Sequence, residues 1–166
     1  MCSSAGIDRP EARSVAPLSA LENEIRELGA HIAAATCRWL TLIGEFDARE
    51  GWQVDGIVSC AHWLSWRCSI GLGTAREYVR VAGRLHELPL VRAAFERGEL
   101  SYCKVRAITR VATRETEEQL VVLARHATGA QLEKVARGCR RVQRAIAAEA
   151  NRCLLYTSDA ADDLTR

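Results

Sequence analysis

The sequence predicts an all-α protein, a bundle of about six or seven helices around one long N-terminal amphipathic helix. Three observations predict this class. Apolar residues recur at steps of three and four, helix-capping residues and glycines separate these stretches, and no segment shows a convincing strand pattern. The 166 residues suit one domain with a sizeable core, and a content of 48% hydrophobic and 27% charged residues is ordinary for a globular protein.

The first helix is expected over residues 18–47, starting at Pro17 or Ser19 and ending before Gly51. Its large apolar residues follow a strict heptad pattern: Leu18, Leu21, Ile25, Leu28, Ile32, Ala35, Trp39, Leu42 and Phe46. Such a row is compatible with a coiled coil between two copies or with the centre of an intramolecular bundle. Leu40 and Ile43 widen the stripe beyond a two-stranded seam, which favours the intramolecular bundle.

Three shorter stretches follow. Ser59 is expected to cap a short helix over residues 60–69, and Thr74 to cap the next one. Pro89 marks a break, because the residue before a proline disfavours helical backbone. A further short helix after Pro89 should close near Gly98.

The remaining helices occupy the second half of the chain. Ser101 is expected to cap a helix over residues 101–114, whose inward-facing residues are Val105, Ile108, Val111 and Ala112. Residues 114–128 continue as another helix, since several glutamates suit its N-terminus. Thr128 is a further capping residue, and Gly129 then separates a last helix that extends to about residue 151.

Both ends of the chain differ from this helical domain, which spans residues 18–152. Residues 1–17 are polar, lack periodicity and are expected to be disordered. The last segment, CLLYTSDAADDLTR (153–166), is not amphipathic and resembles the in-frame translation of a sequencing adapter. We therefore leave it out of the fold prediction and expect the natural protein to continue beyond Arg152.

The charge is distributed unevenly along the chain. The formal net charge is only +2, yet residues 1–73 carry a net charge of −3 and residues 74–152 carry +7. A basic second half is compatible with a nucleic-acid partner. The alternative is a GC-rich coding sequence, because arginine supplies almost all of the positive charge.

Three predicted helices carry arginine stripes opposite their apolar faces. The candidate DNA contacts are Arg76, Arg80, Arg84, Lys104, Arg106, Arg110, Arg114, Arg137 and Arg141. On the last helix, Lys134 and Arg144 belong to the same stripe as Arg137 and Arg141. Such stripes can neutralise phosphates, and a helix in the major groove can place arginine on guanine. The alternative is a solvated face on packed helices. Bulky Trp66 and Arg67 make residues 60–85 a poor helix-turn-helix.

No catalytic or metal site is predicted in this chain. The sequence has no G-x-S-x-G motif and no P-loop, its four histidines are scattered, and no pair of carboxylates stands out. Cys60, His62 and Cys68 lie close together, but a closed zinc site needs a second ligand pair, so the core role is favoured.

Composition also predicts the compartment. The seven cysteines form no CxxC pair and are interpreted as reduced thiols, mostly in the core. The N-terminus has no apolar signal-peptide region, and no apolar run reaches membrane-spanning length. A cytoplasmic location without membrane contact is therefore expected.

Several long segments, taken in order, resemble one known family. The segments EFDAREGW, DGIVSCAHWLSWR, GLGTAREYVRVAGRLHELP and FERGELSYCKVRAITRVATRETEEQL are similar to an actinobacterial helical domain, domain-of-unknown-function family two-two-two, also called the thirteen-E-twelve repeat family. The resemblance covers about residues 18–152. It implies a domain that precedes an HNH endonuclease module. This sequence contains no such module, so the resemblance transfers no catalytic residue, and any divalent metal would belong to the missing module.

Two functions are therefore expected from the sequence. The first is a non-catalytic domain that binds or positions DNA for an HNH nuclease, with DNA as its partner and no cofactor of its own. The second is a helical scaffold that forms a homodimer through residues 18–46 and does not contact DNA.

Overall fold

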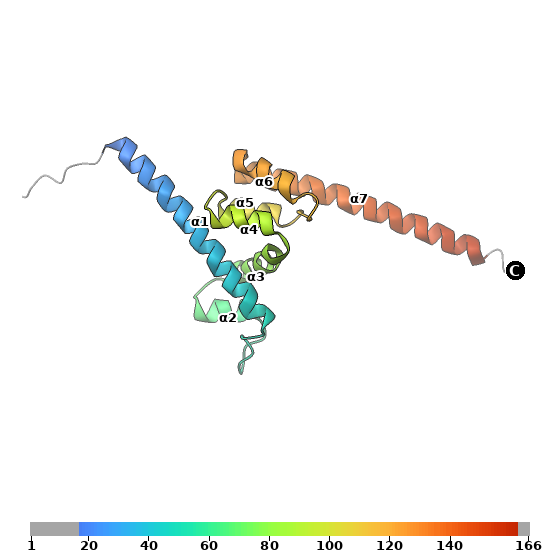
Figure 1. Ribbon diagram of the computed structural model, residues 1–166. Coiled ribbons are helices and arrows are strands. Elements are labelled where there is room, and N and C mark those ends of the chain that lie inside the picture. The colour runs from blue at the N-terminus through green and yellow to red at the C-terminus, as the bar shows by residue number, and fades with distance from the viewer. Residues whose placement is uncertain (1–16, 163–166) are drawn as a thin grey trace, which may run out of the picture.

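The computed structural model describes residues 17–162, and within that range the chain forms seven helices and no strand (Figure 1). The all-α prediction is thus confirmed. The helices are α1 (Leu18–Ala48), α2 (Cys60–Arg67), α3 (Leu72–Glu87), α4 (Pro89–Glu96), α5 (Tyr102–Ile108), α6 (Glu117–His126) and α7 (Gly129–Asp162).

The long helix α1 has almost the predicted bounds. It follows Pro17, whose carbonyl accepts hydrogen bonds from the backbone N–H groups of Ala20 and Leu21. It ends where Glu50 adopts a positive φ of 53° just before Gly51. Its C-terminal half packs on the bundle, while its N-terminal half extends beyond it (Figure 1). Residues 17–29 are all exposed.

The face by which α1 meets the bundle differs from the predicted one. The buried residues of α1 are Ala33, Cys37, Leu40 and Ile43, whereas most of the heptad row faces solvent. At 100° per residue, the two rows lie roughly 130° apart around the helix. The prediction that the heptad row points into the intramolecular core is therefore wrong. A small residue on the buried face lets α3 approach α1 closely. A Cβ on Gly44 would lie only 3.4 Å from the Ala82 carbonyl oxygen of α3.

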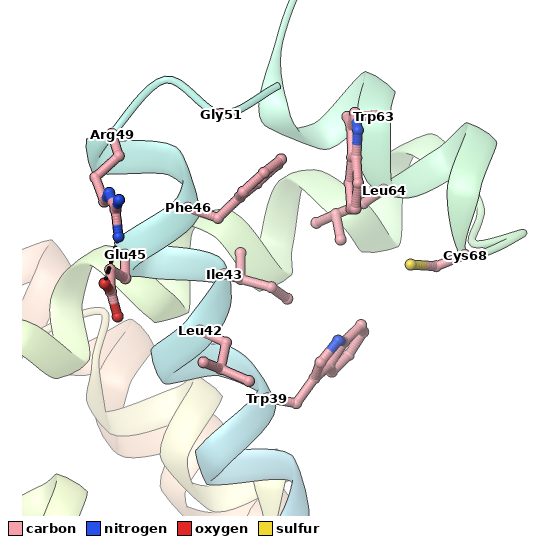
Figure 2. A pocket seen from close by; sticks show the side chains of 10 residues that line it. All are labelled: Trp39, Leu42, Ile43, Glu45, Phe46, Arg49, Gly51, Trp63, Leu64 and Cys68. Atoms are coloured by element: carbon pink, nitrogen blue, oxygen red, sulfur yellow. Dashed lines mark hydrogen bonds and ion pairs between the residues drawn. The ribbon is translucent and has the colours of Figure 1, made fainter. Parts of the chain in front are cut away.

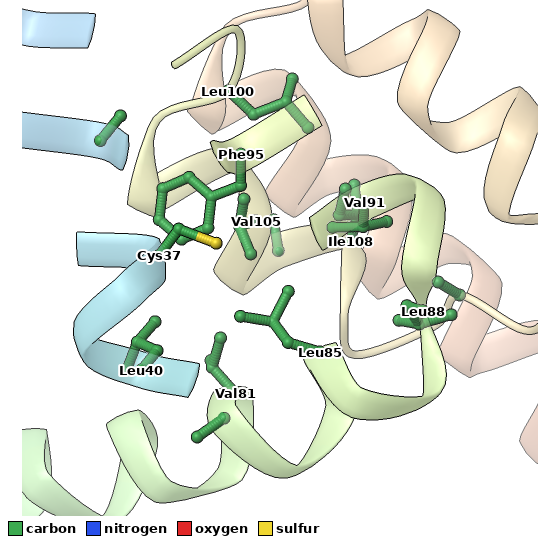
Figure 3. Close-up of a cluster of buried hydrophobic side chains, with 14 of the residues drawn as sticks. Cys37, Leu40, Val81, Leu85, Leu88, Val91, Phe95, Leu100, Val105 and Ile108 are labelled. Atoms are coloured by element: carbon green, nitrogen blue, oxygen red, sulfur yellow. The ribbon is translucent and has the colours of Figure 1, made fainter. Parts of the chain in front are cut away.

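One apolar core receives residues from every helix of the described range, and Figure 3 shows the part of it between α1, α3, α4 and α5. Phe95 of α4 lies fully buried at its centre, next to Cys37 of α1 and Val105 of α5 (Figure 3). All four residues predicted to face inward from residues 101–114 are buried: Val105, Ile108, Val111 and Ala112. The packing signal in the sequence was correct there, although α5 itself ends at Ile108.

Helix starts agree with the predicted caps at two of four places. Ser59 caps α2 by accepting a hydrogen bond from the His62 backbone N–H at 3.2 Å. Thr128 forms a capping box with Gln131, each side chain accepting from the other residue's backbone N–H. Thr74, however, lies inside α3, which starts at Leu72. Ser101 precedes α5 without a side-chain capping hydrogen bond.

A buried glutamate links α6 to α4. Glu117, only 2% exposed, accepts a hydrogen bond from the Val91 backbone N–H at 2.8 Å. Val91 lies in the first turn of α4, where backbone N–H groups have no partner inside the helix. The carboxylate therefore caps α4 from another helix. The sequence showed only that Glu117 suits a helix N-terminus.

The last helix continues further than predicted. α7 extends through residues 153–162 to Asp162, so the helix does not end at Arg152. The predicted adapter origin of residues 153–166 concerns where the segment comes from, and it stays a prediction. The predicted disorder of residues 1–17 falls almost wholly outside the described residues. Among the helices of residues 17–162, none is both long enough and apolar enough to cross a membrane.

Candidate functional site

Predicted basic residues of α3 and of the turn after α5 meet at a charged cluster. Glu77 accepts two hydrogen bonds from Arg80, at 3.0 and 3.1 Å, and one from Arg110 at 2.6 Å. The pKa of Glu77 is lowered to about 2, chiefly by the Arg80 hydrogen bond, with Arg110 adding to the effect against partial burial. Both guanidinium groups thus bind the same carboxylate inside the protein, and its single negative charge offsets one of their two positive charges.

Arg80 and Arg84 also donate hydrogen bonds to backbone carbonyl groups at the C-terminal end of α5. Arg80 Nη2 donates to the Arg106 carbonyl at 3.2 Å and to Thr109 Oγ1 at 3.3 Å. Arg84 donates to the carbonyls of Thr109 at 3.3 Å and Ala112 at 2.5 Å, and it also pairs with Glu87. Carbonyl groups at a helix C-terminus lack partners inside the helix. These two arginines therefore stabilise the early end of α5, where a longer helix was predicted.

Two further predicted contacts are also used inside the molecule. Arg106 Nη2 forms an ion pair with Glu133 of α7 at 3.0 Å. Lys104 Nζ donates to the Ala124 carbonyl at 2.8 Å, near the C-terminus of α6, where a positive charge is favourable. Each basic side chain joins α5 to the helix packed beside it.

The nine predicted DNA contacts thus separate into two groups. Arg80, Arg84, Lys104, Arg106 and Arg110 hold helices together. The other four are exposed and form no ion pair with any residue in the range 17–162: Arg76, Arg114, Arg137 and Arg141. Arg80 and Arg84 of the α3 stripe thus face α5, whereas the basic residues on one side of α7 stay exposed.

The exposed apolar row of α1 is a second candidate site, which we call the seam. It comprises the heptad residues Leu18, Leu21, Ile25, Leu28, Ile32, Ala35, Trp39, Leu42 and Phe46. Leu18 is 84% exposed, Ile25 70% and Ile32 66%. Trp39 and Phe46 are partly buried against the core. Large apolar side chains in such a continuous exposed row are typical of an interaction surface.

The seam leads into an open groove at its C-terminal end. Figure 2 shows Trp39, Leu42 and Phe46 of α1 on one side and Trp63 of α2 on the other. The groove has a volume of about 690 Å³, and the ring centroids of Phe46 and Trp63 lie 4.6 Å apart. Its mouth carries an exposed ion pair between Arg49 and Glu45 at 3.0 Å. Sequence reasoning did not find this groove, because it needs α2 to lie beside α1.

An aromatic chain fixes the wall of this region. Trp39 contacts Tyr78 of α3 edge-on at 5.0 Å between ring centroids, and Tyr78 contacts Tyr102 of α5 at 5.1 Å. Burial of this ring raises the pKa of Tyr102 to about 12. The three rings connect the seam of α1 to the charged cluster at Glu77.

The cysteine-histidine cluster of α2 does not form a ligand set. Cys60 is buried, and burial raises the pKa of its thiol to about 11, while Cys68 is exposed at the far end of the helix. His62 Nδ1 accepts a hydrogen bond from the Val58 backbone N–H at 3.4 Å. In the part of the chain that the structure describes, no three His, Cys, Asp or Glu side chains are grouped as a metal site would require.

The fold and the site define a class of protein: an all-α, multi-helix domain whose exposed features are an apolar seam and a basic helix. The family model described as Domain of unknown function (DUF222) matches residues 18–163, and the chain belongs to that family. The resemblance found in the sequence is confirmed to that extent. No curated protein and no solved structure shows significant similarity to the chain.

Proposed function

We propose that this chain is a helical interaction domain that pairs with a second copy through the seam of α1. The exposure of the seam carries the proposal. α1 meets its own bundle through Ala33, Cys37 and Leu40, so the stretch of the heptad row from Leu18 to Ile32 is left exposed, while Trp39 and Phe46 are partly buried.

The length and spacing of the seam suit helix pairing. It covers residues 18–46, which is about four heptads, and sustained coiled coils need roughly three or four. Water contact with leucine and isoleucine side chains is unfavourable by about 25 cal/mol for each Å². Pairing two seams removes that contact and lets each side chain insert between residues of the facing helix.

Pairing would give the domain a positioning role. The family resemblance implies an HNH endonuclease module after domains of this type, and a dimer would hold two such modules at a defined spacing. In this proposal the helical domain forms the dimer, and the neighbouring HNH module carries out the cleavage reaction.

Sedimentation velocity tests the proposal. The chain should sediment as a dimer whose population rises with concentration, and replacing Ile25 and Ile32 by glutamate should make it monomeric. Val122→Glu is the matched control, because Val122 is 50% exposed on α6, away from the seam. Proposed pairing through α1 would be rejected by a wild-type monomer at all concentrations, or by equal effects of the seam and control variants.

DNA contact through α7 is a second candidate, favoured by one observation. Lys134, Arg137, Arg141 and Arg144 are exposed and lie on one side of α7. A row of this kind can follow a phosphate backbone. Titration of duplex DNA across salt concentrations tests it: Arg137→Ala with Arg141→Ala should lower the salt slope by about two. Arg80→Ala should leave that slope unchanged, since Arg80 serves α5.

A further inference from the structure

We infer that the two α1 helices pair antiparallel, in the register that sets Leu28 of one copy opposite the partner's Ile32. This inference rests on the proposed function, because it specifies how the two seams meet. In this register Ile25 faces the partner's Ala35, and Leu21 faces the partner's Trp39. Leu18 then faces the partner's Leu42, so every contact along the paired region is apolar on both sides.

Charges beside the seam favour this arrangement over a parallel one. Glu24 and Arg38 occupy equivalent places, each immediately before a seam residue, and residues at such places face each other across an antiparallel pair. Glu24 then lies opposite the partner's Arg38, and symmetry forms this ion pair twice. Both side chains are exposed, and neither has an ion-pair partner in residues 17–162.

A parallel pair would not use these charges. There, Glu24 would face the partner's Gly29, and Arg38 would face the partner's Ile43. Gly29 has no side chain to offer, and Ile43 is buried against the bundle. The same Gly29 lies opposite itself in the antiparallel pair. In the single chain, nothing lies within 4 Å of where a Cβ on Gly29 would be. The space beside Gly29 is therefore open to a second helix.

The groove at the end of α1 supports the same orientation. The N-terminal half of α1 projects from the bundle with no helix of its own chain beside it, whereas the C-terminal half has α2 next to the seam (Figures 1 and 2). Antiparallel pairing brings Leu18 and Leu21 of one copy to the partner's groove between α1 and α2. A parallel pair would instead bring the two α2 helices to the same level.

A charge exchange tests the register. In sedimentation velocity at low ionic strength, Glu24→Lys and Arg38→Glu should each weaken dimerisation about tenfold, because each converts two attractions into two repulsions. The double variant restores both attractions and should lie within about threefold of wild type. Glu27→Lys is the matched control, since Glu27 lies away from the seam and should leave dimerisation within about threefold.

The outcomes separate this inference from the proposed function. A monomeric wild-type chain would overturn both. A dimer whose double variant is as weak as the single variants would overturn the register while leaving the pairing. Spin labels at Ser19→Cys, with the other reactive cysteines changed to serine, give an independent distance. The antiparallel register places the two labelled positions about 35 Å apart, and a separation below about 20 Å would establish a parallel pair and overturn the inference.

Discussion

Arg110 and Glu77 lie 33 positions apart in the chain, and Arg110 Nη2 is 2.6 Å from Glu77 Oε1. The same carboxylate binds Arg80 within its own helix. One acidic residue therefore holds α3 against the segment that follows α5. Arg80 and Arg110, which the sequence suggests are DNA contacts, therefore form ion pairs that stabilise the fold.

Glu77→Gln should destabilise the protein by about 1.5–3 kcal/mol at neutral pH, because it leaves two arginines without their charged acceptor. The pKa of Glu77 is about 2 in the folded chain, below the 4.5 of a free glutamate. Its contribution is thus fully present above about pH 4.5 and is lost as the pH falls toward 2. Urea unfolding across this range should show the two proteins converging at low pH. A constant difference would contradict this role.

Arg84→Ala should cost about 1–3 kcal/mol of unfolding free energy, since the carbonyls of Thr109 and Ala112 lose their donor. Arg76→Ala is the matched control on the same helix. Arg76 is exposed and lacks an ion pair among residues 17–162, so its removal should change stability by less than about 0.5 kcal/mol. Equal effects in thermal unfolding would show that Arg84 acts as a surface charge only.

Gly98→Ala should destabilise the protein by about 2 kcal/mol or more. Gly98 has a φ of +71°, and a Cβ there would lie 2.7 Å from the Ala30 carbonyl oxygen of α1. Gly83→Ala should have the opposite sign and stabilise α3 by up to about 1 kcal/mol, because Gly83 is exposed with nothing within 4 Å of an added Cβ. Guanidinium denaturation of the two variants measures both effects.

Leu40→Ala and Leu42→Ala should affect stability differently, because the two residues lie on different faces of α1. Leu40 is fully buried and Leu42 is 54% exposed. The Leu40 variant should lose about 2–5 kcal/mol at every protein concentration. The Leu42 variant should mainly weaken self-association, so its melting temperature should approach that of wild type on dilution. A large, concentration-independent loss in the Leu42 variant would place that residue in the core.

Local signals along the chain were sufficient for much of the fold. Helical periodicity placed α1 to within a residue of its end, and it found the inward residues from Val105 to Ala112. Ser59 and Thr128 marked two helix starts because a hydroxyl oxygen can accept from the first-turn backbone N–H groups of its own helix. Such short-range chemistry depends on neighbours in the sequence, and it can be predicted from them.

The tertiary structure alone decided which face of α1 is buried, where α5 ends and which arginines are free. The periodicity of large apolar residues predicted that the leucine and isoleucine row of α1 would be buried. The packed face instead uses Ala33, Cys37 and Gly44, and the missing side chain of Gly44 lets Ala82 of α3 approach closely. The end of α5 depends on carbonyl acceptors for Arg80 and Arg84 from another helix. Those contacts join residues distant in sequence, so they exist only once the helices have packed.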